Sequence, residues 1–106
     1  YTKINTHHVS LFAKLVERLD NTPDGDGTLL DHTILLYGTG MGDGDHHTPY
    51  NLPVILMGGG SGSLEGGRHM QYAMHTPFMN LGVTLLDKIG VHVDQIADST
   101  DRLTDL

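Results

Sequence analysis

Two short apolar runs, separated by a long polar segment rich in glycine, constrain the fold of this chain more than any other feature. The first run is HTILLYG, residues 32–38, and the second is LPVILMGG, residues 52–59. Both runs are short and both end at glycine, so we predict that they are strands rather than helices. Neither run alternates polar with apolar residues, which indicates strands covered on both faces, as in a parallel or mixed sheet.

The segment before the first strand predicts an amphipathic helix over about residues 6–20, with Asn5 or Thr6 as its N-cap. Its apolar residues recur at spacings of three and four, the spacing of one helix face. The residues that follow this spacing are Val9, Phe12, Val16 and Leu19.

A second helix is predicted over residues 77–89. Thr76 is the expected N-cap, Pro77 the first helical residue and Gly90 the residue just beyond the end. The predicted apolar face of this helix consists of Phe78, Leu81, Leu85 and Ile89.

The connecting segments complete an α/β fold of two to three strands packed with two main helices, in one domain over residues 1–106. Residues 24–27, DGDG, predict a turn. A calcium loop that began at Asp24 would need a carboxylate where the chain has Leu35, so the EF-hand interpretation is rejected. The run RHMQYA, residues 68–73, is a candidate short third strand.

Composition excludes several classes of function. The formal charge of −7, with six scattered basic residues, argues against nucleic-acid binding. No apolar run approaches the roughly 18 residues of a membrane span, and no signal-peptide pattern is present. Without cysteine there are no thiolate ligands, whereas eight histidines and 13 acidic residues favour oxygen and nitrogen ligands for a metal ion.

The segment that joins the two strands carries the candidate metal ligands. Asp43, Asp45 and His47 offer the oxygen and nitrogen donors that suit zinc, manganese, magnesium or calcium. Neighbouring side chains in extended backbone point to opposite sides, so at most one of His46 and His47 is expected to be a ligand. The alternative is a simple turn, in which the aspartates bond to their own backbone.

Arg68 and His69 are candidates for a second role. Arginine can bind an oxyanion through two N–H groups, and histidine can act as a ligand or as an acid and base. The alternative is a hairpin from which Arg68 points into solvent.

The segment HTPYNLPVILMGGG resembles the alkaline phosphatases, in which a zinc-binding His-Thr precedes a Val-Pro and a strand that ends in glycine. Here His47-Thr48 precedes Leu52-Pro53 at the same spacing. The resemblance implies that His47, rather than His46, is the metal ligand.

Almost the whole chain, including GGRHM and TPFMNLGVTLLDKIGV, resembles the C-terminal part of an uncharacterised exported bacterial family named for its HXXSHH motif. That motif is missing here, so the chain looks like a C-terminal fragment of an exported parent, periplasmic or secreted, whose signal and nucleophile lie upstream. Two departures stand out. Pro49 replaces a second histidine of the family, and YGTGMGD replaces the Asp-His metal pair of phosphatases and sulfatases.

The resemblance leaves two hypotheses about function. In the first, the parent is a metal-dependent hydrolase of phosphate or sulfate esters, and the fragment alone is inactive. In the second, the parent is a non-catalytic binding or assembly domain that has lost the metal pair. In either case, open strand edges or an uncovered apolar face predict a homodimer of the isolated chain or contacts with the upstream part of the parent.

Overall fold

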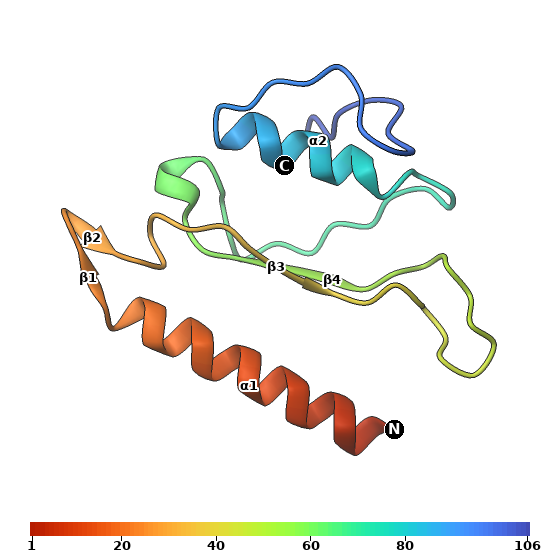
Figure 1. Ribbon diagram of the computed structural model, residues 1–106, viewed down its shortest axis with the longest axis horizontal. Coiled ribbons are helices and arrows are strands. Elements are labelled where there is room, and N and C mark those ends of the chain that lie inside the picture. Colours follow the sequence, from red (N-terminus) through yellow and green to blue (C-terminus); the bar gives the residue numbers. More distant parts are fainter.

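Four short strands form two separate antiparallel hairpins in the computed structural model, which describes residues 1–106. Two helices accompany them, so the fold is mixed α/β (Figure 1). The elements in chain order are α1 (Thr2–Asp20), β1 (Pro23–Asp24), β2 (Gly27–Thr28), β3 (Leu35–Gly38), β4 (Val54–Met57), a 3₁₀ turn (Gly60–Gly62) and α2 (Met79–Lys88).

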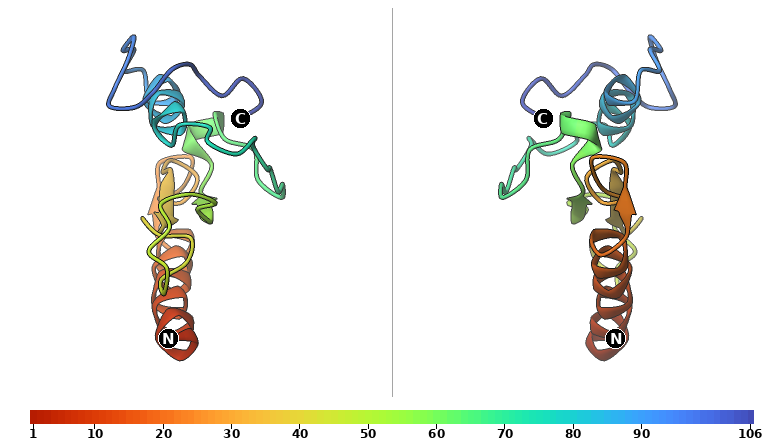
Figure 2. Two further views of the ribbon diagram at one scale, coloured as in Figure 1. Left: turned by 90° about the vertical axis from the view of Figure 1, so that its right-hand side faces the viewer. Right: turned by 90° about the vertical axis from the view of Figure 1, so that its left-hand side faces the viewer.

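The β3–β4 hairpin is the middle of three layers, with α1 on one side and α2 on the other (Figures 1 and 2). Alternate residues of β3 point to opposite sides of the hairpin. Tyr37 stacks on Phe12 of α1, with ring centroids 4.8 Å apart. Its neighbour Leu36 lines a groove together with residues of α2. One face of the hairpin is half-buried and the other, which includes Leu36 and Ile55, is exposed, so the prediction that both faces are covered is wrong.

The expected parallel or mixed sheet is wrong, because β3 and β4 pair antiparallel, with Leu35 opposite Met57 and Gly38 opposite Val54. The connection over residues 39–53 contains no helix. A parallel pair needs a crossover that carries the chain back along the sheet, whereas a loop that simply reverses direction makes a hairpin. The candidate strand at residues 68–73 does not form either.

Helix α1 begins four residues earlier than predicted, and neither Asn5 nor Thr6 caps it. Tyr1 occupies the N-cap position without a side-chain hydrogen bond. Thr6 lies inside the helix, where its hydroxyl donates to the Thr2 carbonyl at 2.8 Å. A threonine can bond to the carbonyl one turn back, and it then continues the helix instead of starting it.

The end of α2 is confirmed and its start is corrected. Gly90 has φ of 83° and donates to the Asp87 carbonyl, while Val91 donates to the Leu86 carbonyl. These are the two bonds of a Schellman motif, which needs a residue in the left-handed conformation. At the start, the helix begins at Met79 and not at Pro77. Thr76 does not cap it, because its hydroxyl donates to the Ala73 carbonyl at 2.7 Å.

Residues 91–106 form no helix or strand and run beside α2 (Figure 1), where polar side chains of the helix hold them. The Asn80 carboxamide oxygen accepts the backbone N–H groups of Thr100 and Asp101, at 2.8 and 3.3 Å. The Thr84 hydroxyl accepts the N–H of Leu103 at 2.8 Å. Asn80 and Thr84 lie one turn apart, so one face of α2 binds the tail.

The layers enclose very little core. Only four residues of 106 are buried, and Val83 is the single hydrophobic one among them. The radius of gyration is 15.2 Å, against about 13 Å for a compact domain of this length. The expected lack of a membrane span is confirmed, since neither helix has the length and apolar character to cross a bilayer.

Candidate functional site

The loop between β3 and β4, residues 39–53, folds back on itself at the tip of the hairpin. Asp43 and Thr48 form an isolated antiparallel bridge. The Gly42 N–H donates to the Thr48 carbonyl at 2.8 Å. A Cβ at Gly42 would collide with the Tyr50 carbonyl, so the loop can close this tightly only because that residue is glycine.

Asp43 organises the turn inside this loop. One of its carboxylate oxygens accepts the backbone N–H groups of Asp45 and His46, at 2.9 and 3.2 Å. The other lies 3.0 Å from His46 Nδ1. The hydrogen bond from the His46 side chain, followed by the two from the backbone, lowers the pKa of the Asp43 carboxyl below its ordinary value.

The structure pairs Asp43 with His46, whereas the sequence favoured His47. His47 has a left-handed backbone, with φ of 56°, and its Nδ1 lies 3.2 Å from the Asp45 carbonyl oxygen. All four side chains of residues 43 and 45–47 are exposed. The turn interpretation of Asp43 therefore describes the observed hydrogen bonds.

The predicted metal ligands Asp43, Asp45 and His47 do not converge. No three histidine, aspartate or glutamate side chains in the chain lie close enough together to hold a metal ion. The residues of this loop therefore do not by themselves fit the group that the resemblance implies. Binding of zinc, manganese, magnesium or calcium stays a prediction.

The Asp43–His46 pair nevertheless leaves one imidazole nitrogen, His46 Nε2, available to bind a metal ion or accept a proton. When Nδ1–H of His46 donates to the carboxylate, Nε2 becomes the free acceptor of the ring. A carboxylate that orients an imidazole in this way is the usual partner of a metal-binding or proton-accepting histidine. Among the four exposed side chains, His46 is thus the one whose imidazole a carboxylate of the loop orients.

Arg68 and His69 do not join this loop, since no hydrogen bond or ion pair links either of them to residues 43–47. The Arg68 guanidinium donates to the Asp105 carbonyl at 2.9 Å and twice to the Glu65 carbonyl. Next to it, the Tyr72 hydroxyl donates to the Asp105 carboxylate at 2.9 Å. Burial and then Asp105 raise the pKa of Tyr72 to about 12. Arg68 thus anchors the tail, and an oxyanion-binding role for Arg68 or His69 stays a prediction.

Sequence reasoning missed a second cluster of ionisable side chains, at the β1–β2 hairpin. His32 lies between two carboxylates, with Nδ1 2.8 Å from Asp24 and Nε2 3.0 Å from Asp26. The hydrogen bond that the His32 ring donates to Asp24 is the main cause of a raised His32 pKa. The signal available in the sequence was a DGDG turn followed closely by a histidine.

Comparisons with protein-family models, with curated proteins and with solved structures give no significant match to this chain.

Proposed function

We propose that this chain is one portion of a larger exported α/β protein similar to the alkaline phosphatase and sulfatase superfamily, and that it has no catalytic activity of its own. Its role in that protein is one of assembly. It contributes the β3–β4 hairpin and the two covering helices to a wider sheet, and it places loop 39–53 at the rim of that sheet.

The observation that supports this proposal is the incomplete core. Two strands covered by a helix on each face are a three-layer arrangement, but the hairpin is too narrow to bury either helix, and α1 has no buried residue at all. Both outer edges of the hairpin are free, because β3 and β4 pair only with each other. Between β3 and α2 an apolar groove of about 340 Å³ is open to solvent. Further strands beside the hairpin would cover the helices and satisfy the free edges.

Amide hydrogen exchange on the purified chain, combined with urea unfolding, tests this role. We expect a small free energy of unfolding and fast exchange along β3 and β4, because few apolar contacts protect them. We also expect no hydrolysis of p-nitrophenyl phosphate or p-nitrophenyl sulfate. A cooperative transition with a free energy of unfolding above about 5 kcal/mol, typical of an independent domain, would contradict the proposal.

A second candidate function is favoured by the Asp43–His46 pair. In it, the larger protein is a hydrolase of phosphate or sulfate esters, and His46 Nε2 is this chain's contribution to a shared metal site. The resemblance implied His47 for that role, so the two histidines make matched variants. In the full-length protein, His46→Ala should lower metal content and ester hydrolysis, while His47→Ala should leave both unchanged. Equal metal content and activity in both variants would favour the purely non-catalytic role.

A further inference from the structure

The exposed face of α1 carries two parallel rows of side chains along the helix. We call the first the cationic row, which consists of Lys3, Lys14 and Arg18, and the second the apolar row, which consists of Ile4, Leu11 and Leu15. Within each row the residues are separated by four, seven or eleven positions, so each row follows one line along the helix surface. All six side chains are exposed.

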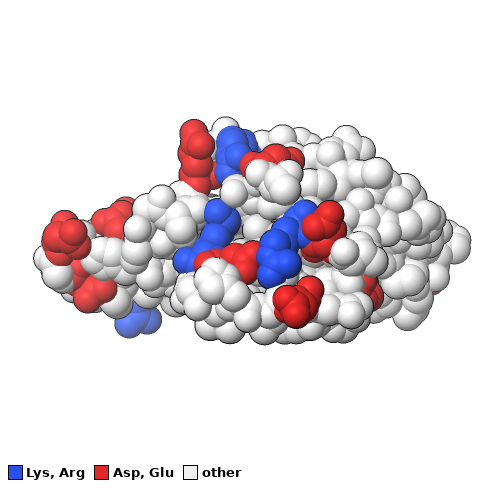
Figure 3. Space-filling model, turned by 90° about the horizontal axis from the view of Figure 1, so that it is seen from above, with Lys and Arg blue, Asp and Glu red and all other residues white.

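The cationic row has no counter-charges within the chain, since none of its side chains takes part in an ion pair or a side-chain hydrogen bond to an acidic group. The other three basic residues are all engaged. Arg102 pairs with Asp87 at 2.6 Å, while Lys88 and Arg68 donate to backbone carbonyls. Seen from the α2 side, basic and acidic side chains lie next to each other (Figure 3). In a chain of net charge −7, the basic side chains that make no hydrogen bond within the chain are therefore all on α1.

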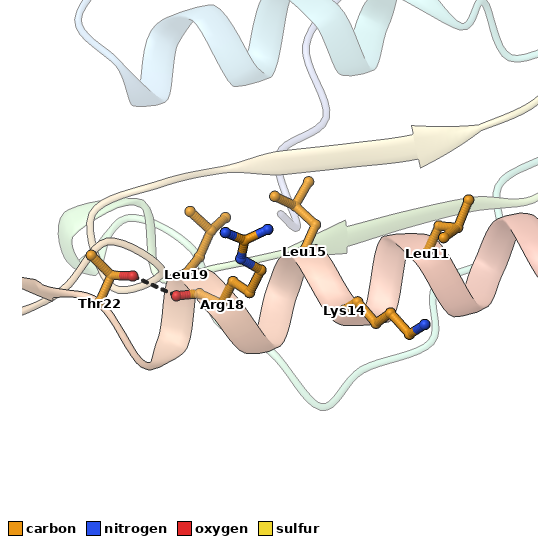
Figure 4. Close-up of a pocket in the computed structure, with 6 residues that line it drawn as sticks. All are labelled: Leu11, Lys14, Leu15, Arg18, Leu19 and Thr22. Atoms are coloured by element: carbon orange, nitrogen blue, oxygen red, sulfur yellow. Dashed lines mark hydrogen bonds between the residues drawn. The ribbon is translucent and has the colours of Figure 1, made fainter.

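Leu11 and Leu15 of the apolar row border a shallow trough. Ile4, Leu11 and Leu15 are 58, 48 and 46% exposed, and they lie beside the side of the helix that packs on the hairpin through Phe12. The trough has a volume of about 450 Å³. Its leucines point the same way, with the Arg18 guanidinium between Leu15 and Leu19 (Figure 4). Lys14 and Arg18 thus flank an apolar strip of Leu11, Leu15 and Leu19.

We propose that this face of α1 is a docking surface for an acidic amphipathic helix of another polypeptide. Leucine-type side chains of the partner helix would pack between Ile4, Leu11 and Leu15, since rows at spacings of three and four residues are the ridges by which helices pack. Carboxylates on one flank of the partner would pair with Lys3, Lys14 and Arg18. The inference rests on the proposed role in a larger assembly, and it names the chemistry of one contact in that assembly.

A second copy packed antiparallel through α1 does not fit this surface. In an antiparallel pair of α1 helices related by a two-fold axis, the same flank of each helix faces its copy, so the two cationic rows would meet. A lipid surface fits less well than a helix. The open strip contains no tryptophan or phenylalanine, and anionic lipids would repel a chain with a charge of −7.

The test is binding of the full chain to a synthetic helical peptide with leucines at heptad spacing flanked by glutamates, compared with the same peptide flanked by lysines. Leu11→Ser/Leu15→Ser should weaken binding of the glutamate peptide, because it removes the apolar strip. Lys14→Gln/Arg18→Gln should weaken binding of the glutamate peptide about tenfold through the loss of two exposed ion pairs.

The control variant is Gln71→Glu/Thr104→Glu, which changes the net charge by the same amount at exposed positions outside α1. It should bind the glutamate peptide as the unmodified chain does. Lys14→Glu/Arg18→Glu should reverse the preference and select the lysine peptide.

Backbone amide shifts locate the contact, and they should change along α1 and not along β3 or β4. Failure of this inference is thus distinct from failure of the proposed assembly role, which is measured by exchange in the hairpin. Equal affinity for the two peptides, or no binding to either, would overturn the proposal. So would shifts along α1 that depend on chain concentration alone, or stronger binding of α1 to vesicles of anionic phosphatidylglycerol than to the glutamate peptide.

Discussion

At the scale of single residues, the His32 imidazole links the β1–β2 hairpin to the segment that leads into β3. Only the protonated ring can donate from both nitrogens, so the contacts with Asp24 and Asp26 form together only in the charged state. The Asp24 hydrogen bond, with Coulombic contributions from Asp24 and Asp26, raises the pKa of His32, and desolvation acts in the opposite direction.

The sign of the resulting pH dependence follows from the raised pKa. The stabilisation of the folded hairpin is fully present below the unfolded histidine pKa of about 6.5, and it is lost as the pH rises through the higher pKa of the folded state. An NMR titration of the His32 ring should therefore give a midpoint above the ordinary value. Asp24→Asn should lower that midpoint more than Asp26→Asn does. An unchanged midpoint in both variants would show that the carboxylates do not act on the ring.

At the scale of elements, the end of α2 depends on the conformation of one residue. Gly90 has φ of 83°, and a Cβ built there meets no atom within 4 Å. Gly90→Ala should therefore destabilise the fold by about 1–2 kcal/mol, through the cost of the left-handed backbone alone. Gly66 is the matched control, because a Cβ built there also meets no atom within 4 Å and its φ is not positive. Gly66→Ala should therefore have no destabilising effect. Urea unfolding of both variants would measure the difference, and equal losses would refute the backbone explanation.

The polar face of α2 makes a second prediction at this scale. Asn80 is 5% exposed and accepts two backbone N–H groups of the tail. Asn80→Ala would leave those donors without a partner, at a cost of about 1–3 kcal/mol. Hydrogen exchange at Thr100 and Asp101 should accelerate in this variant, with exposed Thr104→Ala as the control. Unchanged exchange would mean that the tail is held by other contacts.

At the scale of the whole molecule, the open surfaces predict self-association of the isolated chain. The free edges of β3 and β4 offer unpaired backbone groups, and Leu36 and Ile55 are 43 and 42% exposed on the hairpin. Light scattering should show a monomer at low concentration and a dimer as the concentration rises. Replacing Ile55 with lysine should reduce dimer formation, because a charge on an edge strand opposes pairing. A monomer at every concentration would contradict edge pairing.

The sequence by itself determined the local features of this protein. The two strands, the two helices, the Asp-Gly turn and the end of α2 at Gly90 depend on residues within a few positions of one another, and all of them are present. The half-buried face of α1, with Phe12, Val16 and Leu19, also follows from local spacing, whereas Val9, predicted on the same face, is 43% exposed.

Only the tertiary structure decided which distant groups meet. The start of α2 is capped by Asp98, whose carboxylate accepts the Met79 N–H from 19 residues away, and not by neighbouring Thr76. The most buried residues of α2 include Asn80 and Thr84, because the tail covers that face instead of the predicted apolar one. The backbone conformation of loop 39–53 likewise turned His46, and not His47, toward Asp43. The spacing of residues along a helix or strand determines which side chains share a face. Which distant segment packs on that face depends on the packing of the whole molecule.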